Sequence, residues 1–211
     1  GWLCVLMGAF LAILAGCSAA GEPYTQGSVI LSEAFSEPSA WETYSDTGVD
    51  LRVSDGVYLF QTGDAGYIWG LNEQIHRDVV IEVAASQGSV SEDNAYGVMC
   101  RADTSNNGDG YYFLVSGDGF YTIARGEGDS VSALLEWTES EAIVQGAGTN
   151  TIRAVCIGDY LGMYVNGRFL TELRDETYLS GYAGLAGTAF QGGEMTIHFD
   201  NLTIWEAALG E

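Results

Sequence analysis

The feature that most constrains the fold of this chain is the repeated alternation of apolar and polar residues between residues 29 and 206. Alternation with a period of two is typical of β-strands, because successive side chains of a strand point to opposite faces of its sheet. No stretch of this region keeps a period of 3.6 residues, so we expect helices to be minor. The expected strands cover residues 29–35, 49–53, 56–61, 65–70, 78–85, 94–102, 110–116, 120–126, 132–137, 151–157, 160–166, 168–173, 181–190 and 194–206.

The segments between these runs are rich in turn-forming residues, such as SDG, GDG and GEGD. Asn166-Gly167, which lies between two apolar runs, predicts a tight β-hairpin. The chain holds 29 glycines and only 2 prolines, and 47% of its residues are apolar, which suits many short strands around one core. No change of composition divides residues 29–206, so we predict a single all-β domain, built as a large sandwich or barrel.

The first residues form an almost unbroken apolar run from Trp2 to Gly16. The run is shorter than the ~20 residues that a membrane-spanning helix needs, and it matches the apolar region of a secretory signal peptide. We therefore expect residues 1–16 to be a signal peptide that exports the protein. Because the chain starts at Gly1, with neither a Met nor basic residues before the run, we also expect its natural start to lie upstream.

The end of this run, Leu14-Ala15-Gly16-Cys17, resembles the bacterial lipobox, in which a Leu and two small residues precede a Cys. The resemblance implies that Cys17 carries a diacylglycerol thioether and becomes the first residue of the mature protein. Residues 17–28 then form a flexible tether, and the protein is lipid-anchored to a bacterial membrane, at the cell envelope or cell surface. The alternative is an ordinary signal peptide in which the Cys occurs by chance.

Two cysteines, Cys100 and Cys156, fall within the predicted domain. Each shares one face of an alternating run with apolar residues, so both thiols are expected to point into the core. An exported protein meets oxidising conditions, and we therefore predict a buried Cys100–Cys156 disulfide between two strands. The alternative is a pair of free buried thiols.

The charge of the chain is strongly negative, with 29 acidic residues against 7 basic ones and a formal net charge of -22. Such a surface repels nucleic-acid phosphates and anionic lipid headgroups, so we expect no nucleic-acid partner and no electrostatic attachment to membranes. Solubility, for example in a salty habitat, is a sufficient reason for this charge. Cation binding is the alternative.

Seven sequence pieces follow one another between about residue 30 and residue 206. They are Phe35-Ser-Glu-Pro-Ser-Ala-Trp41, Gly56-Val-Tyr-Leu, Arg77-Asp-Val-Val-Ile-Glu-Val, Asn94-Ala-Tyr-Gly-Val-Met-Cys-Arg101, Gly110-Tyr-Tyr-Phe-Leu-Val, Tyr160-Leu-Gly-Met-Tyr-Val-Asn-Gly167 and Phe199-Asp-Asn-Leu-Thr-Ile204. In this order they resemble the concanavalin A-like lectin and glucanase superfamily, in particular laminin-G-like domains and the 3-keto-disaccharide hydrolase family. The resemblance implies two curved antiparallel sheets packed as a jelly-roll sandwich, with the concave face as the usual ligand site. It does not by itself imply an activity.

Glucanases of this superfamily place two Glu and one Asp at alternating positions of one strand, so that all three carboxylates enter the cleft. This chain lacks that motif. The nearest polar set is Glu194, Thr196, His198 and Asp200, which alternation puts on one face of a strand. A His between carboxylates can act as a general base or as a metal ligand. The alternative, which we favour, is the water-facing side of an outer strand.

Asp103, Asn107 and Asp109 resemble the start of a calcium-binding loop, which makes calcium the one cofactor that the sequence suggests. The position at which such a loop needs a bidentate Glu is occupied by Leu114. We therefore expect a polar hairpin loop and no cofactor, because Asp, Asn and Gly all suit turns.

A sugar-binding surface needs aromatic rings for stacking and planar polar groups for hydrogen bonds. Arg101 directly follows Cys100, and adjacent side chains of a strand point to opposite faces. We therefore expect the side chain of Arg101 to leave the core and point to the other face. Trp69, Tyr112 and Trp137 lie in predicted strands that border that face, and together with Arg101 they form the candidate ligand-binding set. The alternative for each aromatic residue is a place in the core.

The sequence thus predicts a cell-surface lipoprotein whose β-sandwich, residues 29–206, binds a glycan or another surface ligand without catalysis. A short tail, residues 207–211, would follow the domain. One alternative is a glycoside hydrolase of the 3-keto-disaccharide type that uses Glu194 and His198. The other is a structural domain of the envelope that has no small ligand.

Overall fold

The computed structural model describes residues 21, 23–37, 41–63, 66–190 and 193–210, and within these residues it contains sixteen β-strands and no helix. The strands form two antiparallel sheets. The nine-stranded sheet consists, in order, of β14 (Arg168–Arg174), β13 (Tyr160–Val165), β12 (Thr149–Ile157), β6 (Val79–Gln87), β16 (Met195–Leu209), β4 (Val57–Thr62), β3 (Val49–Ser54) and β2 (Tyr44–Asp46), with β1 (Tyr24–Glu33) also paired to β16. The seven-stranded sheet consists of β10 (Ser130–Ala133), β9 (Phe120–Glu127), β8 (Gly110–Ser116), β7 (Asn94–Ala102), β15 (Gly181–Ala189) and β5 (Gly66–His76), with β11 (Thr138–Glu139) also paired to β9.

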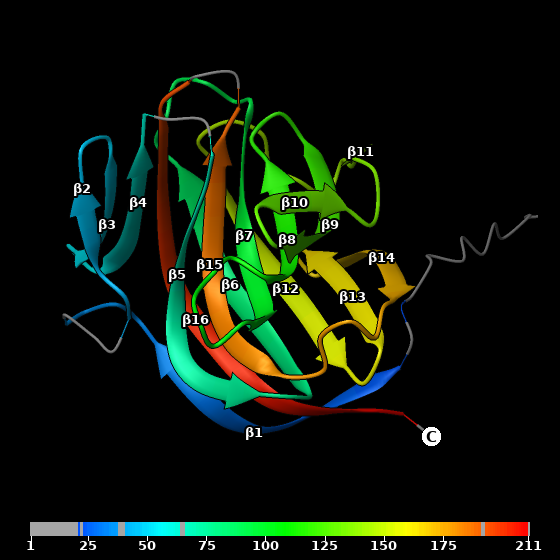
Figure 1. The fold of residues 1–211 in the computed structure, drawn as a ribbon. Helices are drawn as coiled ribbons and strands as arrows, with labels where there is room; N and C mark the ends of the chain where they lie inside the picture. The colour runs from blue at the N-terminus through cyan, green and yellow to red at the C-terminus, as the bar shows by residue number, and fades with distance from the viewer. Residues whose placement is uncertain (1–20, 22, 38–40, 64–65, 191–192, 211) are drawn as a thin grey trace, which may run out of the picture.

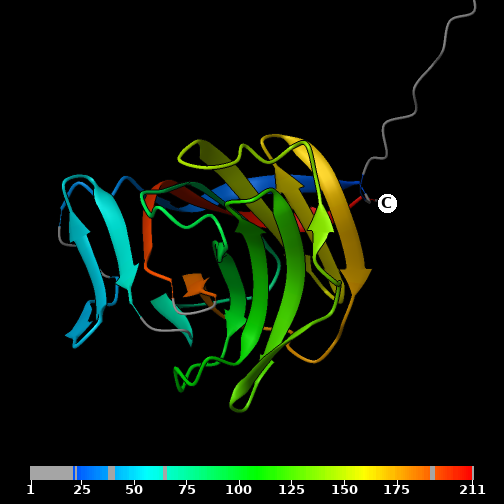
Figure 2. The same cartoon turned by 90° about the horizontal axis from the view of Figure 1, so that it is seen from above.

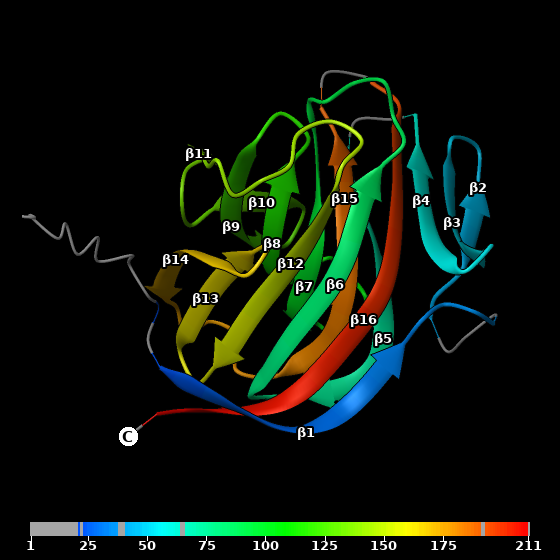
Figure 3. The ribbon, with the colours of Figure 1, turned by 180° about the vertical axis from the view of Figure 1, so that it is seen from behind.

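The two sheets pack face to face, as Figure 1 shows from one side and Figure 3 from behind, while Figure 2 gives the view from above. The core between them is built from alternate residues of facing strands. Val98 and Phe113 enter it from the seven-stranded sheet, Ile81 and Ile197 enter it from the nine-stranded sheet, and all four are fully buried. This packing accounts for the period of two in the sequence. The predicted antiparallel two-sheet jelly-roll sandwich is confirmed.

The predicted disulfide is also confirmed, and it links the two sheets. Cys100 in β7 and Cys156 in β12 are joined by an S–S bond of 2.04 Å, with their Cα atoms 7.0 Å apart. Both residues are buried in the core between the sheets. The bond closes a loop with a sequence separation of 56 residues, so it removes conformational freedom from the unfolded chain.

The expected strands match the observed ones well in the middle of the chain and less well at its ends. β1 begins at Tyr24, inside the segment expected to be a tether, and β16 continues to Leu209, inside the expected tail. The two strands run side by side at these ends, because Tyr24 pairs with Leu209 (Figure 3). Each end becomes a strand because the other supplies its backbone hydrogen bonds, and the composition of either segment alone does not predict this pairing.

The segment expected as one strand over residues 132–137 is irregular between β10 and β11. The amides of Leu134 and Leu135 both donate to the carbonyl of Ile123, which interrupts the regular ladder. The hairpin predicted at Asn166-Gly167 is present between β13 and β14, and both turn residues have positive φ, 52° and 75°. Positive φ at both positions is the property for which Asn-Gly is favoured in two-residue hairpins.

Each sheet also carries apolar side chains on the face turned away from the common core. On the seven-stranded sheet, Met99, Tyr112 and Leu114 form a second buried cluster, while Val98 and Phe113 beside them point into the core. On the nine-stranded sheet, Val80 and Val155 belong to a third cluster. Among the residues that the structure describes, no helix has the length and apolar character needed to cross a membrane.

Candidate functional site

The outer face of the seven-stranded sheet gathers a set of aromatic side chains that are not part of the common core. We call this surface the aromatic face and define it by Tyr67, Trp69, Tyr112, Trp137 and Phe190; Tyr182 of the same cluster lines neither hollow described below. Tyr112 is fully buried in the sheet, while the other four are only partly buried and leave ring surface open to solvent. Partly open aromatic rings beside polar groups are typical of small-molecule sites.

One hollow on this face, here called the acidic hollow, has a volume of about 440 Å³. It is lined by Asp93, Ser116, Asp118, Phe120, Trp137 and Phe190. The rings of Trp137 and Phe190 meet edge to face, with centroids 6.0 Å apart and planes at 90°. This volume falls within the range of about 300–1,000 Å³ that is usual for small-molecule sites. The hollow therefore combines aromatic walls with carboxylates.

The turn between β8 and β9 positions one of the two carboxylates. The amide of Gly119 donates to the carbonyl of Ser116 over 3.1 Å, and Gly119 has a φ of 100°, which favours glycine. The hydroxyl of Ser116 donates to a carboxylate oxygen of Asp118, which holds that side chain at the hollow. The other carboxylate belongs to Asp93, an exposed residue just before β7.

A second hollow, here called the tyrosine hollow, has a volume of about 350 Å³. It is lined by Gly66, Tyr67, Trp69, Asn107, Gly108, Tyr112, Gly128, Asp129, Ser130 and Val131. The rings of Tyr67 and Tyr112 are 5.4 Å apart, and the hydroxyl of Tyr112 donates to the carbonyl of Gly108 over 2.6 Å. Burial raises the pKa of both tyrosines, so both hydroxyls are protonated at neutral pH, and that of Tyr112 already donates its proton to Gly108.

The two hollows lie towards opposite ends of β8. That strand runs from Gly110 to Ser116; Ser116 lines the acidic hollow, and Gly108 and Tyr112 line the tyrosine hollow. Both hollows open on one face, because Tyr112 and Ser116 are four residues apart on this strand and project to the same side of it. The arrangement suits an elongated ligand better than a compact one.

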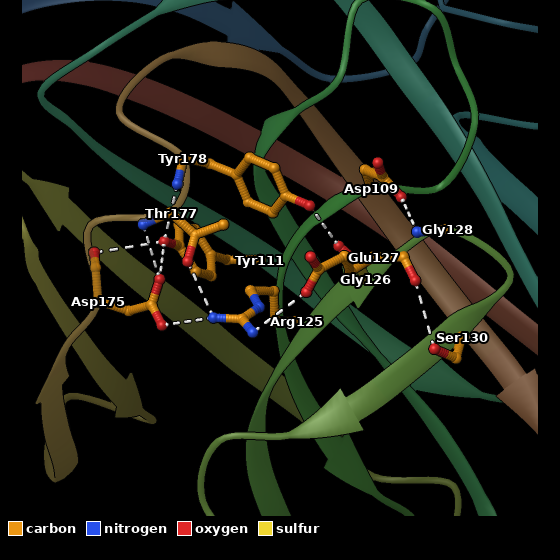
Figure 4. Close-up of polar contacts among 10 residues, drawn as sticks. All are labelled: Asp109, Tyr111, Arg125, Gly126, Glu127, Gly128, Ser130, Asp175, Thr177 and Tyr178. Atoms are coloured by element: carbon orange, nitrogen blue, oxygen red, sulfur yellow. Dashed lines mark hydrogen bonds and ion pairs between the residues drawn. The ribbon is translucent and has the colours of Figure 1, made fainter.

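A polar network supports the end of β9 that borders the tyrosine hollow (Figure 4). Arg125 donates to Asp175 over 2.8 Å, and the hydroxyl of Tyr111 donates to the same carboxyl group over 2.5 Å. The hydroxyl of Tyr178 donates to the carbonyl of Gly126 over 2.9 Å. These bonds join the connection between β14 and β15 to β8 and β9, and so hold the turn that ends the hollow.

The acid strength of Asp175 reflects this network. Burial by itself raises the pKa of its carboxyl group, but hydrogen bonds from Tyr111 and Thr177, together with the charge of Arg125, outweigh burial and lower the pKa overall. Burial and the hydrogen bond to Asp175 raise the pKa of Tyr111 to about 12. The carboxyl group is therefore ionised and the phenol protonated at neutral pH, which is the state that the hydrogen bond requires.

The expectation that Arg101 leaves the core is wrong. Its side chain is buried, and its guanidinium donates to the carbonyls of Arg77 and Tyr178, with Asp78 3.7 Å away. The cause is a bulge: the pairing of β7 with β15 shifts register here, and Arg101 has a φ of 55°. An extra residue in one strand breaks the alternation, so Arg101 follows Cys100 to the inner side. Arg101 therefore does not belong to the aromatic face.

The structure brings the three aromatic candidates to that face and divides them between the hollows. Trp69 and Tyr112 line the tyrosine hollow, whereas Trp137 lines the acidic one. The indole of Trp69 also donates to the side chain of Asn106 over 2.6 Å, which ties it to the loop after β7. Their role in ligand binding stays a prediction.

The catalytic candidates lie on the other sheet, and the structure divides them between two hollows. Glu194 and Thr196 border a hollow beside β3 and β4, whereas His198 and Asp200 border a different one beside β6. Asp200 accepts hydrogen bonds from the backbone and side chain of Asn201. Met195, Ile197 and Phe199 point into the core from the same strand, which is the alternation that the sequence predicted.

The calcium-loop candidates form a hydrogen-bonded loop between β7 and β8. Asp103 accepts from the amide of Ser105, Asn107 accepts from the amide of Asp109, and Asp109 accepts from the amide of Gly128. In the part of the chain that the structure describes, no cluster of three or more His, Cys, Asp or Glu side chains is arranged to hold a metal ion. The lipidation candidate Cys17 lies outside the described residues.

Several lining residues were not among the sequence candidates. Asp93, Asp118 and Phe190 come from three separate connections, before β7, after β8 and after β15. Asp118 lies in a segment that the sequence marks only as a turn, and Phe190 ends a segment marked only as a strand. The strand order β9-β8-β7-β15 brings these three residues together, because it places their connections along one edge of the aromatic face.

No protein-family model matches the chain, and no curated protein matches it either. Solved structures, in contrast, are similar to it in fold. The carbohydrate-binding module CBM66 from Bacillus subtilis is 18% identical with a TM-score of 0.64, over 80% of this chain and 97% of that one. A Bacillus subtilis protein of unknown function with a galectin-like fold is 11% identical with a TM-score of 0.65, over 89% of this chain and 100% of that one.

A β-glucanase from Bacillus licheniformis is 8% identical with a TM-score of 0.58, over 86% of this chain and 99% of that one. At these levels of identity the likeness concerns the fold alone. The fold of this chain is a two-sheet jelly-roll sandwich like that of these three structures. The predicted resemblance to the concanavalin A-like superfamily is therefore confirmed at the level of fold.

Proposed function

We propose that this protein is a non-catalytic carbohydrate-binding module that takes its ligand on the aromatic face. The observation that carries the proposal is the acidic hollow, in which Trp137 and Phe190 present ring surface beside Asp93 and Asp118. The apolar face of a pyranose ring packs on an aromatic ring, and sugar hydroxyls donate hydrogen bonds to carboxylates. Both functions are available here within one open cavity.

The likeness of the fold to CBM66 and to the β-glucanase supports the same proposal. The hydrolase alternative has less support. Its candidates Glu194 and His198 border different hollows on the nine-stranded sheet, whereas a glycosidase needs its two acid–base groups on either side of one bond. A structural envelope domain would have no use for open aromatic hollows.

A glycan array followed by isothermal titration calorimetry on residues 21–211 tests the proposal. We expect binding of at least one glycan class, weakened about twofold to tenfold in Trp137→Ala, since an aromatic contact contributes about 0.5–1.5 kcal/mol. Trp205→Ala is the matched control, because Trp205 is also partly buried but lies on the outer face of the other sheet. Equal weakening by both variants, or no binding by the parent protein, contradicts the proposal. Release of reducing sugar would favour the hydrolase.

The proposal extends to location: a lipoprotein held at the cell envelope through Cys17. It rests on the apolar run and the Leu14-Ala15-Gly16-Cys17 motif in the sequence. The full chain, with residues 1–16 retained, should become labelled when it is expressed in bacteria that are fed an alkyne fatty acid. Cys17→Ser should abolish the label, whereas Cys4→Ser, which changes a leader cysteine, should keep it. Labelling that survives Cys17→Ser contradicts this part of the proposal.

A further inference from the structure

Among the residues that the structure describes, the acidic hollow is lined by two carboxylates and by no basic side chain, and this bears on the kind of glycan it takes. Asp93 and Asp118 both line it, while none of the seven basic residues of the chain, all of them arginines, is among its lining residues. Most of those arginines are engaged elsewhere, such as Arg125 with Asp175 and Arg153 with Glu82. The field inside the hollow is therefore negative.

Resting on the proposed function, we infer that the acidic hollow selects glycans that carry a positively charged ammonium group, that is, amino sugars whose nitrogen is not acetylated. An ammonium group forms charge-assisted hydrogen bonds with carboxylates. It is also attracted to the face of an aromatic ring within about 6 Å, most strongly to that of Trp. The hollow offers both partners, with two carboxylates beside Phe120, Trp137 and Phe190.

The same charges discriminate against other glycans. A uronic acid or a sulfated sugar brings a negative group to a hollow with two carboxylates, on a chain whose formal net charge is -22. Like charges brought together without screening disfavour binding. A neutral sugar keeps the stacking contact but lacks the ion pair. The expected order of affinity is therefore ammonium sugar, then neutral sugar, then anionic sugar.

The test compares three β-1,4-linked pentasaccharides that differ only at carbon 2 of each ring. These are the pentamers of glucosamine, N-acetylglucosamine and glucose, titrated into the protein at pH 6, where the amine of glucosamine is protonated. We expect the glucosamine pentamer to bind about tenfold more tightly than either of the others, and 0.5 M salt to remove most of that preference.

Charge-neutralising variants separate the hollow from the general charge of the protein. Asp93→Asn and Asp118→Asn should each reduce the preference for the glucosamine pentamer about fivefold. Asparagine at residue 118 can still accept the hydrogen bond of Ser116, and Asp93 is exposed, so both variants should fold. Glu206→Gln is the matched control, since Glu206 is an exposed carboxylate on the other sheet. It should leave the preference unchanged.

The outcomes distinguish the inference from the proposed function. Equal binding of all three pentamers, lost in Trp137→Ala, overturns the inference and keeps the proposed function. Binding of monomeric glucosamine that depends on Asp93 and Asp118, with no binding of any pentamer, supports an ammonium site but overturns the glycan function. An equal effect of Glu206→Gln and the hollow variants overturns the inference, because attraction would then come from net charge alone.

Discussion

Trp137 and Phe190 meet edge to face at a centroid distance of 6.0 Å, although they come from segments before β11 and after β15. Their contact forms one wall of the acidic hollow, and neither residue belongs to the core between the sheets. The contact therefore shapes an open surface of the protein. An edge-to-face contact fixes the orientation of each ring, which prepares a flat surface for a ligand before it binds.

Phe190→Ala should reduce the affinity for the bound glycan about fivefold, since it removes a partner that orients Trp137. The melting temperature should change little, because Phe190 is only partly buried. Calorimetry measures the affinity. Phe169→Ala is the control, as Phe169 makes a similar edge contact with Tyr164 away from the aromatic face. A loss of affinity in the control variant would argue against a local role for Phe190.

Replacing both Cys100 and Cys156 by Ala should lower the free energy of unfolding by about 4 kcal/mol, the value for a closed loop of this length. The far-ultraviolet circular dichroism spectrum should keep its β-sheet shape, because the core contacts around both residues remain. Urea unfolding of the oxidised parent and the double variant gives the difference. A change below about 1 kcal/mol would mean that the bond adds little to the folded state.

Arg101→Met should destabilise the protein by about 2–4 kcal/mol, because the carbonyls of Arg77 and Tyr178 lose their buried donor. The folded fraction of this variant should bind glycans with unchanged affinity, since Arg101 lines neither hollow. Urea unfolding and calorimetry measure the two quantities separately. A large loss of affinity with unchanged stability would restore the ligand-binding role that the sequence suggested.

The lowered pKa of Asp175 makes part of the stability depend on pH. Its folded-state pKa lies below the ordinary value of about 3.9, so the ionised carboxylate stabilises the fold above that pH. This contribution is lost as the pH falls through the lowered pKa. The difference in unfolding free energy between the parent and Asp175→Asn should be constant near pH 6 and shrink below about pH 4. Glu176→Gln, at a neighbouring exposed residue, is the control; a difference that does not shrink in acid would contradict the assignment.

The sequence predicts most of this fold because apolar residues of the common core recur at every second position in many strands. The runs at residues 94–102 and 110–116 match β7 and β8 at both ends. The same rule fails at Arg101, where a bulge shifts the register by one residue, and no residue type marks that shift in advance. The ends of the chain fail for another reason, since Tyr24 and Leu209 gain strand structure only from each other.

The site is less predictable than the fold. The aromatic candidates Trp69, Tyr112 and Trp137 are recognisable as residue types, but their division between two hollows depends on which strands are neighbours. Asp93 and Phe190 are close only because β7 and β15 pair, which brings segments far apart in the sequence together. Contacts between distant segments follow from topology, and local patterns do not encode topology.

The central claim is that a glycan binds on the aromatic face, and the indole N–H signals of the four tryptophans within residues 21–211 provide a direct test. These signals are resolved by ¹⁵N–¹H correlation spectra and assigned with single Trp→Phe variants. Titration with a glycan that binds on the array should shift the signals of Trp137 and Trp69 and leave that of Trp205 in place. A shift of Trp205 alone, or binding that moves neither Trp137 nor Trp69, would contradict the account.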